Sequence, residues 1–170
     1  MALLEPLSLV HVYCDGACSP NPGVGGWAAL LLAMDHPGHT RELSGAEPTT
    51  TNNRMELTAA IRALQALKRP CEVVIHTDST YVKNAFTNGW LKKWQANGWL
   101  TRDQNAVLNE DLWRTILALE ATHRVTWVWV RGHTDNALHN RVDALAVEAR
   151  IAYAAQVRAP EGSPGFVTNL

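Results

Sequence analysis

Three carboxylates occupy positions where the surrounding sequence predicts burial. The apolar run LVHVYC ends at Asp15, and the run CEVVIHT ends at Asp78. Glu56 lies in the stretch TTTNNRMELTAAIRALQAL, residues 49–67. Wound at 3.6 residues per turn, that stretch places Glu56 on the apolar stripe that the helix is expected to bury. Each of the three acids is therefore a candidate for chemistry as well as for structure.

Carboxylates held close together in a low-dielectric site repel one another and raise one another's pKa values. A bound divalent cation removes this conflict. No cluster of histidines and cysteines stands in register with the three acids, so oxygen ligands and a hard ion, Mg²⁺ or Mn²⁺, are indicated. Magnesium commonly completes its coordination with phosphate oxygens of a substrate. The acids therefore predict metal-dependent phosphoryl chemistry.

Each acid also has a simpler structural explanation when it is taken alone. Asn53 precedes Glu56 by three residues, which nearly matches a helix capping box. Asp78 could cap the helix that follows it, and Asp15 could be a turn residue. Asp143 lies at the margin of the apolar face of the last expected helix and could be solvated. These explanations become strained only when the acids are considered together.

The elements that must position these acids alternate between strands and helices. We expect an α/β fold with a mixed sheet and helices packed on it, in which ligands bind at the carboxyl ends of strands. One domain is expected over residues 1–155, with a disordered tail over 156–170. The expected strands are 7–16, 27–34, 39–47 as a polar edge, 71–78 and 124–130, and the expected helices are 49–67, segments of 79–120 around a loop near 97–105, and 137–155.

Composition bounds the class of protein. The chain has 170 residues, of which 46% are hydrophobic and 18% charged, with a net charge of −1. No apolar run is long enough to span a membrane, and the first residues lack a basic leader, so a cytoplasmic location is expected.

The cysteines and the overall charge limit the chemistry further. Cys14, Cys18 and Cys71 cannot all pair, and a C-x₃-C pair alone does not favour zinc. The overall charge does not favour nucleic-acid binding, which must depend on local charge.

Four blocks of the sequence resemble the signature blocks of bacterial type 1 ribonuclease H. They are YCDGACSPNPGVGGWAALL, TTNNRMELTAAIRAL, IHTDSTYV and WVRGHTDNALHNRVDALA, in family order from about residue 8 to residue 153. The resemblance implies the ribonuclease H-like fold: a five-stranded mixed sheet, antiparallel over its first three strands and then parallel, with helices on both faces. It also implies an endonuclease that hydrolyses the RNA strand of RNA–DNA hybrids, leaving 5′-phosphate and 3′-hydroxyl ends.

By this resemblance Asp15, Glu56, Asp78 and Asp143 bind two Mg²⁺ ions, with Mn²⁺ as a possible substitute and Asp15 bridging the ions. His133 matches a mobile histidine of the family that is proposed to assist proton transfer or product release. The loop around His133 departs from the family pattern, because His139 stands at an asparagine-like position and Asp135 adds an acid.

Substrate contacts are likewise implied by matching positions. Short polar groups are expected in the minor groove of the hybrid, where 2′-hydroxyls identify the RNA strand. A pocket is expected for a phosphate of the DNA strand, and a basic handle at about residues 88–105 is expected to grip the DNA backbone. The implied residues are Cys18, Asn21, Asn52 and Asn53 for the minor groove, Thr51, Arg54 and Asn109 for the phosphate pocket, and Trp90, Lys92, Lys93 and Trp94 for the handle.

The handle has a structural alternative and an electrostatic weakness. Its tryptophans are spaced as core residues of an amphipathic helix. Residues 81–102 contain four cations and no acid, but Gln95, Asn97 and Gln104 stand where further cations are often found. We therefore expect binding that weakens readily with salt. Thr80 replaces the usual glutamine of the family, which puts one base-edge contact in doubt.

Three other functions remain open at the level of sequence. The chain could be another enzyme on the same carboxylate scaffold, such as a transposase, integrase or junction resolvase. It could be a hybrid-binding module without activity, or an α/β binding protein whose acids are helix caps. An RNA–DNA hybrid is the expected partner, no membrane association is expected, and a monomer is the default.

Overall fold

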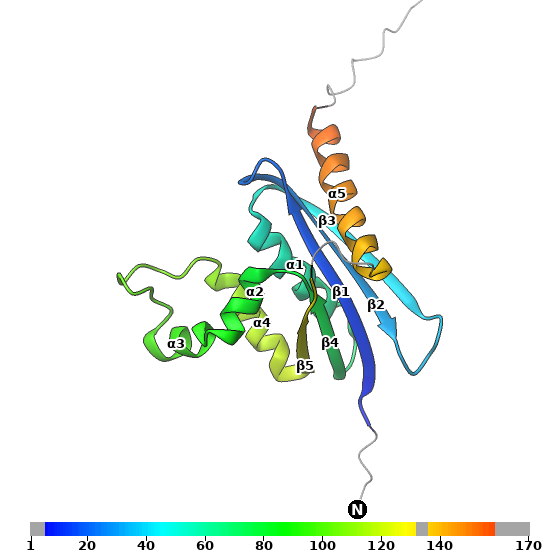
Figure 1. Cartoon of the computed structure of the whole chain (residues 1–170), viewed down its shortest axis with the longest axis horizontal. Coiled ribbons are helices and arrows are strands. Elements are labelled where there is room, and N and C mark those ends of the chain that lie inside the picture. The colour runs from blue at the N-terminus through cyan, green and yellow to red at the C-terminus, as the bar shows by residue number, and fades with distance from the viewer. Residues whose placement is uncertain (1–5, 132–135, 159–170) are drawn as a thin grey trace, which may run out of the picture.

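A computed structural model describes residues 6–131 and 136–158. Their strands form one five-stranded sheet in the order β3-β2-β1-β4-β5 (Figure 1). The elements are β1 Ser8–Cys18, β2 Gly23–Ala33, β3 Thr40–Thr50, α1 Asn52–Gln65, β4 Cys71–Thr77, α2 Thr80–Thr87, α3 Trp90–Asn97, α4 Glu110–Thr122, β5 Arg124–Trp129 and α5 Ala137–Arg158.

The sheet is mixed, as the sequence predicts. β1 pairs antiparallel with β2, and β2 pairs antiparallel with β3. On its other side β1 pairs in parallel with β4, which pairs in parallel with β5. The central strand β1 therefore joins an antiparallel half to a parallel half, and β3 is an edge strand with mostly polar residues.

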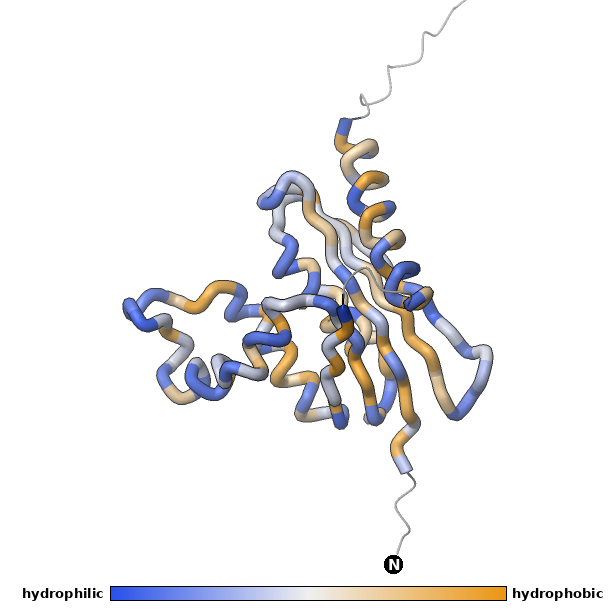
Figure 2. Tube along the Cα trace, viewed as in Figure 1, coloured by the Kyte–Doolittle hydropathy of each residue, from blue (hydrophilic) through white to orange (hydrophobic). Residues whose placement is uncertain are grey.

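Helices cover both faces of the sheet, because side chains of each strand alternate between two apolar surfaces. Helices α1 and α5 lie on opposite faces, α5 mainly over β2, β1 and β3 (Figure 1). Figure 2 shows hydrophobic stretches along the strands between them. Helix α1 buries its alanines and Leu64 against one face, and α5 packs Val142 and Ala146 against the other. The α1 face of the strands consists of Val10, Val12, Cys14, Ala29, Leu31, Val73 and Ile75, and the α5 face includes Ala28 and Leu30.

Helices α2, α3 and α4 form a second apolar cluster beside the sheet. Its centre is Trp113 of α4, which is fully buried and contacts Trp94 of α3 with ring centroids 6.2 Å apart. Helix α3 and the loop after it project away from the sheet (Figure 1). The segment expected to form the handle is therefore tied to the body through tryptophan packing.

Several boundaries differ from the sequence predictions: β2 begins at Gly23 and not at residue 27, β3 ends at Thr50 and not at residue 47, and three further differences concern β1, α1 and α5. Strand β1 continues to Cys18, so Asp15 does not end it. Helix α1 is capped by Thr51 and not by Asn53, because the Thr51 hydroxyl accepts a hydrogen bond from the Arg54 amide at 3.2 Å. Helix α5 runs to Arg158, past residue 155, where the helix was expected to end.

No helix within the described ranges is both long and apolar enough to cross a membrane. The three cysteines are free thiols, and Cys14 and Cys71 are buried.

Candidate active site

Asp15 and Asp78 lie at the same level of the sheet, although only Asp78 follows the end of a strand. The last parallel pair of β1 and β4 is Tyr13 with His76, and each aspartate stands two residues beyond it. The rings of Tyr13 and His76 stack with centroids 4.3 Å apart. Beyond this pair β4 ends, while β1 continues beside β2 with Asp15 opposite Ala28. The two carboxylates therefore meet where the parallel half of the sheet stops.

Glu56 reaches the same place from the first turns of α1. The backbone of β1 allows this approach because residue 16 is glycine: a Cβ atom there would lie 2.6 Å from the backbone nitrogen of Glu56. The carboxyl groups of Asp15 and Glu56 lie close enough that the charge of Asp15 acts on Glu56. Within the described chain the buried Oε2 atom of Glu56 has no hydrogen-bond partner. The stripe of α1 that was predicted to be buried therefore places its one carboxylate, Glu56, beside Asp15.

Burial and mutual repulsion raise the pKa values of this pair. The pKa of Asp15 rises to about 6, first because the group is buried and then because of the charge on Asp78. The pKa of Glu56 lies well above its ordinary value because of burial, followed by the charge of Asp15. Burial and repulsion therefore disfavour the state in which both carboxyl groups are ionised.

A polar cleft of about 380 Å³ opens over these groups. It brings together all four acids that the sequence predicts, including Asp143 from α5. Asn52 and Asn53 at the start of α1 and Thr80 at the start of α2 also line it. The short Thr80 side chain is exposed at this rim. The complete lining is Asp15, Gly16, Asn52, Asn53, Glu56, Asp78, Ser79, Thr80, Tyr81, His139, Asn140 and Asp143.

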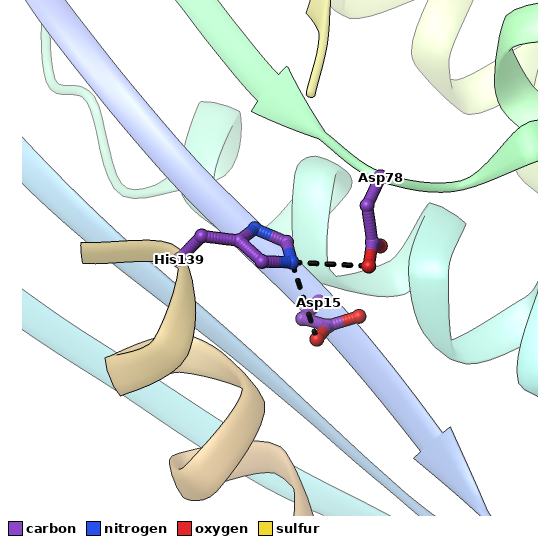
Figure 3. Close-up of side chains that lie close together, drawn as sticks. All are labelled: Asp15, Asp78 and His139. Atoms are coloured by element: carbon purple, nitrogen blue, oxygen red, sulfur yellow. Dashed lines mark ion pairs between the residues drawn. The ribbon is translucent and has the colours of Figure 1, made fainter. Parts of the chain in front are cut away.

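His139 is a site residue that the sequence prediction does not assign. Its Nε2 atom lies 3.0 Å from Oδ2 of Asp78 and 3.9 Å from Oδ2 of Asp15 (Figure 3). The side chain is 3% exposed, and its Nδ1 atom has no hydrogen-bond partner among the described residues. The hydrogen bond to Asp78 raises the pKa of the imidazole. A sequence signal existed, because His139 precedes Asp143 by four residues and therefore shares its helix face.

These groups fit a divalent cation. One ligand atom each from Asp15, Asp78 and His139 lie within 4.8 Å of one another. The unpartnered Oε2 atom of Glu56 adds a buried oxygen that lacks the donor such a group normally has. A bound dication would satisfy this oxygen and relieve the repulsion that raises the Asp15 pKa.

The residues expected to contact the minor groove lie around the N-terminus of α1. Asn52 and Asn53 line the cleft. Asn21, from the turn after β1, accepts a hydrogen bond from the Asn52 amide at 3.2 Å. The Cys18 thiol lies within 3.5 Å of the carbonyl oxygens of Pro20, Gly23 and Thr50. Asn21 and Cys18 do not line the cleft itself, but they adjoin it.

The structure also brings together the three residues expected to hold a phosphate. Thr51 caps α1 through the amide of Arg54, and Nη1 of Arg54 lies 3.3 Å from Oδ1 of Asn109. The Arg54 guanidinium also forms an ion pair with an acid, because it donates hydrogen bonds to both carboxylate oxygens of Asp111 at 3.0 and 2.9 Å. The cationic group of this pocket is thus already paired.

The handle combines packing and exposed charge. Trp90 and Trp94 are half-buried, with ring centroids 6.0 Å apart, and both pack against the apolar cluster around Trp113. The structural alternative is therefore confirmed for these tryptophans. Lys92 and Lys93 are exposed on α3. His133 and Asp135 lie outside the described residues.

Comparison with known proteins gives a consistent result. The family model described as "RNase H" matches residues 8–151. A curated ribonuclease H of Thermoanaerobacter sp. (strain X514) is 54% identical over 142 residues, which is 84% of this chain and 90% of that protein. The ribonuclease H of Chlorobium luteolum is 56% identical over 140 residues, which is 82% of this chain and 94% of that protein.

Solved structures show the same fold. LC9-RNase H1, described as a type 1 RNase H with the type 2 active-site motif, has a TM-score of 0.76 and 34% identity, covering 87% of this chain and 74% of its own. LC11-RNase H1, solved in complex with an RNA/DNA hybrid, has a TM-score of 0.65 and 22% identity, covering 85% of this chain and 99% of its own. The second likeness concerns the fold alone.

Proposed function

The chain belongs to the ribonuclease H family, and from this premise we propose that it hydrolyses the RNA strand of RNA–DNA hybrids with the help of two Mg²⁺ ions. Mn²⁺ is the proposed substitute. One observation carries the proposal: four carboxylates from separate elements line one cleft, and a buried oxygen of Glu56 lacks a partner among the described residues there. The expected products are 5′-phosphate and 3′-hydroxyl ends.

Asp15, Glu56, Asp78 and Asp143 are the proposed cation ligands. Bound dications supply an activated water and charge stabilisation for the leaving 3′-oxygen. The chain contributes the position of each carboxylate: β1 fixes Asp15, α1 fixes Glu56, the end of β4 fixes Asp78, and α5 fixes Asp143. Asp15 is central among the ligands because it neighbours both Glu56 and Asp78. His133 is proposed to move a proton near the leaving group or to assist product release.

Recognition of the hybrid is proposed to combine three surfaces. The polar groups around the α1 N-terminus face the minor groove, where ribose hydroxyls distinguish RNA from DNA. The pocket at Arg54 receives a phosphate of the DNA strand, and the exposed lysines of α3 add counterion release. The proposed contacts are Cys18, Asn21, Asn52, Asn53, Thr51, Arg54, Asn109, Trp90, Lys92, Lys93 and Trp94, with the two tryptophans acting by supporting the handle.

The decisive experiment uses an RNA–DNA hybrid labelled at the RNA 5′ end, with duplex DNA of the same sequence as the control substrate. The native chain should cleave only the hybrid, and only when Mg²⁺ or Mn²⁺ is present. The Asp15→Asn variant should bind the hybrid and fail to cleave it. Normal cleavage by this variant would remove Asp15 from the mechanism, and cleavage of duplex DNA would favour a different nuclease on the same scaffold.

We also propose that the chain acts as a cytoplasmic monomer. Nothing in this proposal requires a second copy, since the four acids come from one chain. Light scattering of the purified chain should give the mass of one 18.7 kDa protomer. A dimer at micromolar concentration would contradict it.

A further inference from the structure

We infer that His139 is a nitrogen ligand of the cation held between Asp15 and Asp78, and that it shifts the metal preference of the site from Mg²⁺ toward Mn²⁺. This inference rests on the proposed function, because it concerns the same cation site. It adds a ligand that the four carboxylates do not include.

The position of His139 supports a ligand role. Its Nε2 atom is 3.0 Å from one oxygen of Asp78 and 3.9 Å from one oxygen of Asp15. Adjacent ligands of an octahedral ion at about 2.1 Å are roughly 3.0 Å apart, and opposite ligands are roughly 4.2 Å apart. The measured separations lie within this range. Since the three ligand atoms all lie within 4.8 Å of one another, small side-chain adjustments would let one ion contact the imidazole and both aspartates.

The surroundings of the ring also favour this role over an ordinary surface contact. His139 is buried in the first turn of α5, and Figure 3 shows its ring directed from that helix toward both aspartates. The Asn136 side chain caps this turn by accepting from the amides of Leu138 and His139 at 3.1 and 3.0 Å. This cap fixes the backbone of His139 at the start of α5, the position from which its ring reaches the two aspartates.

A nitrogen donor changes which ion binds best. Mg²⁺ prefers oxygen ligands and gains little from an imidazole, whereas Mn²⁺ and later transition metals accept nitrogen readily. A site of carboxylates alone lacks this discrimination. His139 should therefore raise the affinity for Mn²⁺ relative to Mg²⁺ by about tenfold, a change of the size that a single ligand or its supporting group can produce.

The alternative is that His139 only orients Asp78 through their ion pair. In that case its replacement would weaken both metals equally, and no nitrogen would contact the ion. These two roles make different predictions for a spectroscopic measurement that does not depend on activity.

The test is electron spin-echo spectroscopy of the full chain with one equivalent of Mn²⁺, together with calorimetric titrations of Mn²⁺ and Mg²⁺. We expect nitrogen modulation typical of a bound imidazole in the native chain. It should disappear in His139→Asn and in His139→Gln, and it should remain in His36→Asn, which replaces an exposed histidine near Asp35. The ratio of Mn²⁺ to Mg²⁺ affinity should fall about tenfold in the two His139 variants.

Bound Mn²⁺ without imidazole modulation in the native chain would overturn the inference and leave the proposed function intact. Modulation that persists in both His139 variants, or an unchanged affinity ratio, would overturn it as well. A native chain that binds neither metal would overturn both the inference and the proposed metal mechanism.

Discussion

Gly16 and Glu56 are in backbone contact, since a Cβ atom at residue 16 would lie 2.6 Å from the backbone nitrogen of Glu56 and 2.6 Å from the carbonyl carbon of Met55. Because the obstructing atoms belong to the backbone, they cannot move aside as a flexible side chain would. The distance between β1 and α1, and hence between Asp15 and Glu56, depends on this missing side chain.

Gly16→Ala should therefore impair the site without changing any charge. We expect a loss of about 2 kcal/mol or more in stability, as for other overpacked interiors, and a decrease in Mn²⁺ affinity of roughly tenfold or more, as for a displaced ligand or supporting group. Gly45→Ala is the matched control, because a Cβ atom there would lie 2.6 Å from the ring of Trp27, and β2 and β3 carry none of the proposed ligands. If the two variants lost similar stability and also lost metal affinity to the same extent, the loss of affinity would reflect general destabilisation and not the position of Glu56.

The raised pKa of Asp15 makes the stability of the metal-free protein depend on pH. A carboxyl group whose folded pKa of about 6 exceeds the ordinary value of 3.8 favours the folded state while it is protonated, and this benefit is lost as pH rises through 6. Asp15→Asn should therefore stabilise the metal-free protein at pH 8 by about 1–3 kcal/mol and much less at pH 4. Chemical unfolding in EDTA measures this difference.

The matched control for that experiment is Asp103→Asn, which alters an exposed loop aspartate. Its effect on stability should be small at both pH values. A stabilisation by Asp15→Asn that was equal at pH 4 and pH 8 would contradict the electrostatic origin.

Added cation should act in the opposite direction to proton loss. At pH 8, Mg²⁺ at about 100 times its dissociation constant should stabilise the native chain by about 2.7 kcal/mol, because binding neutralises the carboxylates that repel one another. The Asp15→Asn variant should gain far less. Thermal unfolding with and without Mg²⁺ provides the comparison, and an equal gain in both proteins would show that the ion binds elsewhere.

The ion pair between Arg54 and Asp111 should restrain substrate binding. The pair is partly exposed, with side-chain exposures of 36% and 64%, so its removal should cost at most about 1 kcal/mol in stability. Asp111→Asn frees the guanidinium for a phosphate and should tighten binding of a hybrid several-fold in EDTA, as measured by fluorescence anisotropy. Arg54→Ala should weaken binding.

Glu110→Gln serves as the control for Asp111→Asn, since it removes an acid from the same helical turn but one that pairs with Arg114. A purely long-range charge effect would make the two variants alike. A clear difference between them is expected, because Arg54 donates its hydrogen bonds to Asp111 and not to Glu110.

The exposed lysines of α3 should govern the salt dependence of binding. Replacing Lys92 and Lys93 together by glutamine should lower the slope of log affinity against log salt by about one for each phosphate that the handle no longer neutralises. Lys68→Gln is the control, because Lys68 is exposed just beyond the C-terminal end of α1, whereas the cleft lies at its N-terminal end. Because the handle has few cations, binding of the native chain should be weak enough to be lost at moderate salt, with a slope that corresponds to few phosphate contacts. A slope that implies many phosphate contacts would contradict this expectation.

The convergence of the acids could be predicted from sequence because it depends on periodicity and strand order. Asp15 meets Asp78 even though the predicted end of the first strand was wrong. Strand β1 continues to Cys18, but its parallel partner β4 stops before Asp78, and the cleft opens beyond the end of β4. The Asn53 cap could not be separated from Thr51 by residue type, since both residues are good caps. The helix begins at Asn52, so Thr51 is the residue that precedes it and caps it.

The role of His139 could not be predicted because its direction depends on how α5 docks. Its spacing from Asp143 gives a common helix face, yet only packing of Val142 and Ala146 on β2 turns that face toward Asp15. The pairing of Arg54 with Asp111 was likewise hidden, since the two residues are distant in sequence and meet only after α4 packs on α1.

The order in which the chain supplies its acids has a consequence for synthesis on the ribosome. β1 emerges first and α5 last, so a nascent polypeptide already containing Asp15, Glu56 and Asp78 still lacks Asp143 and one wall of the cleft. Translation must pass α5, and this helix must dock, before the proposed nuclease is complete. We therefore expect a chain that has been translated only as far as β5 to have no nuclease activity.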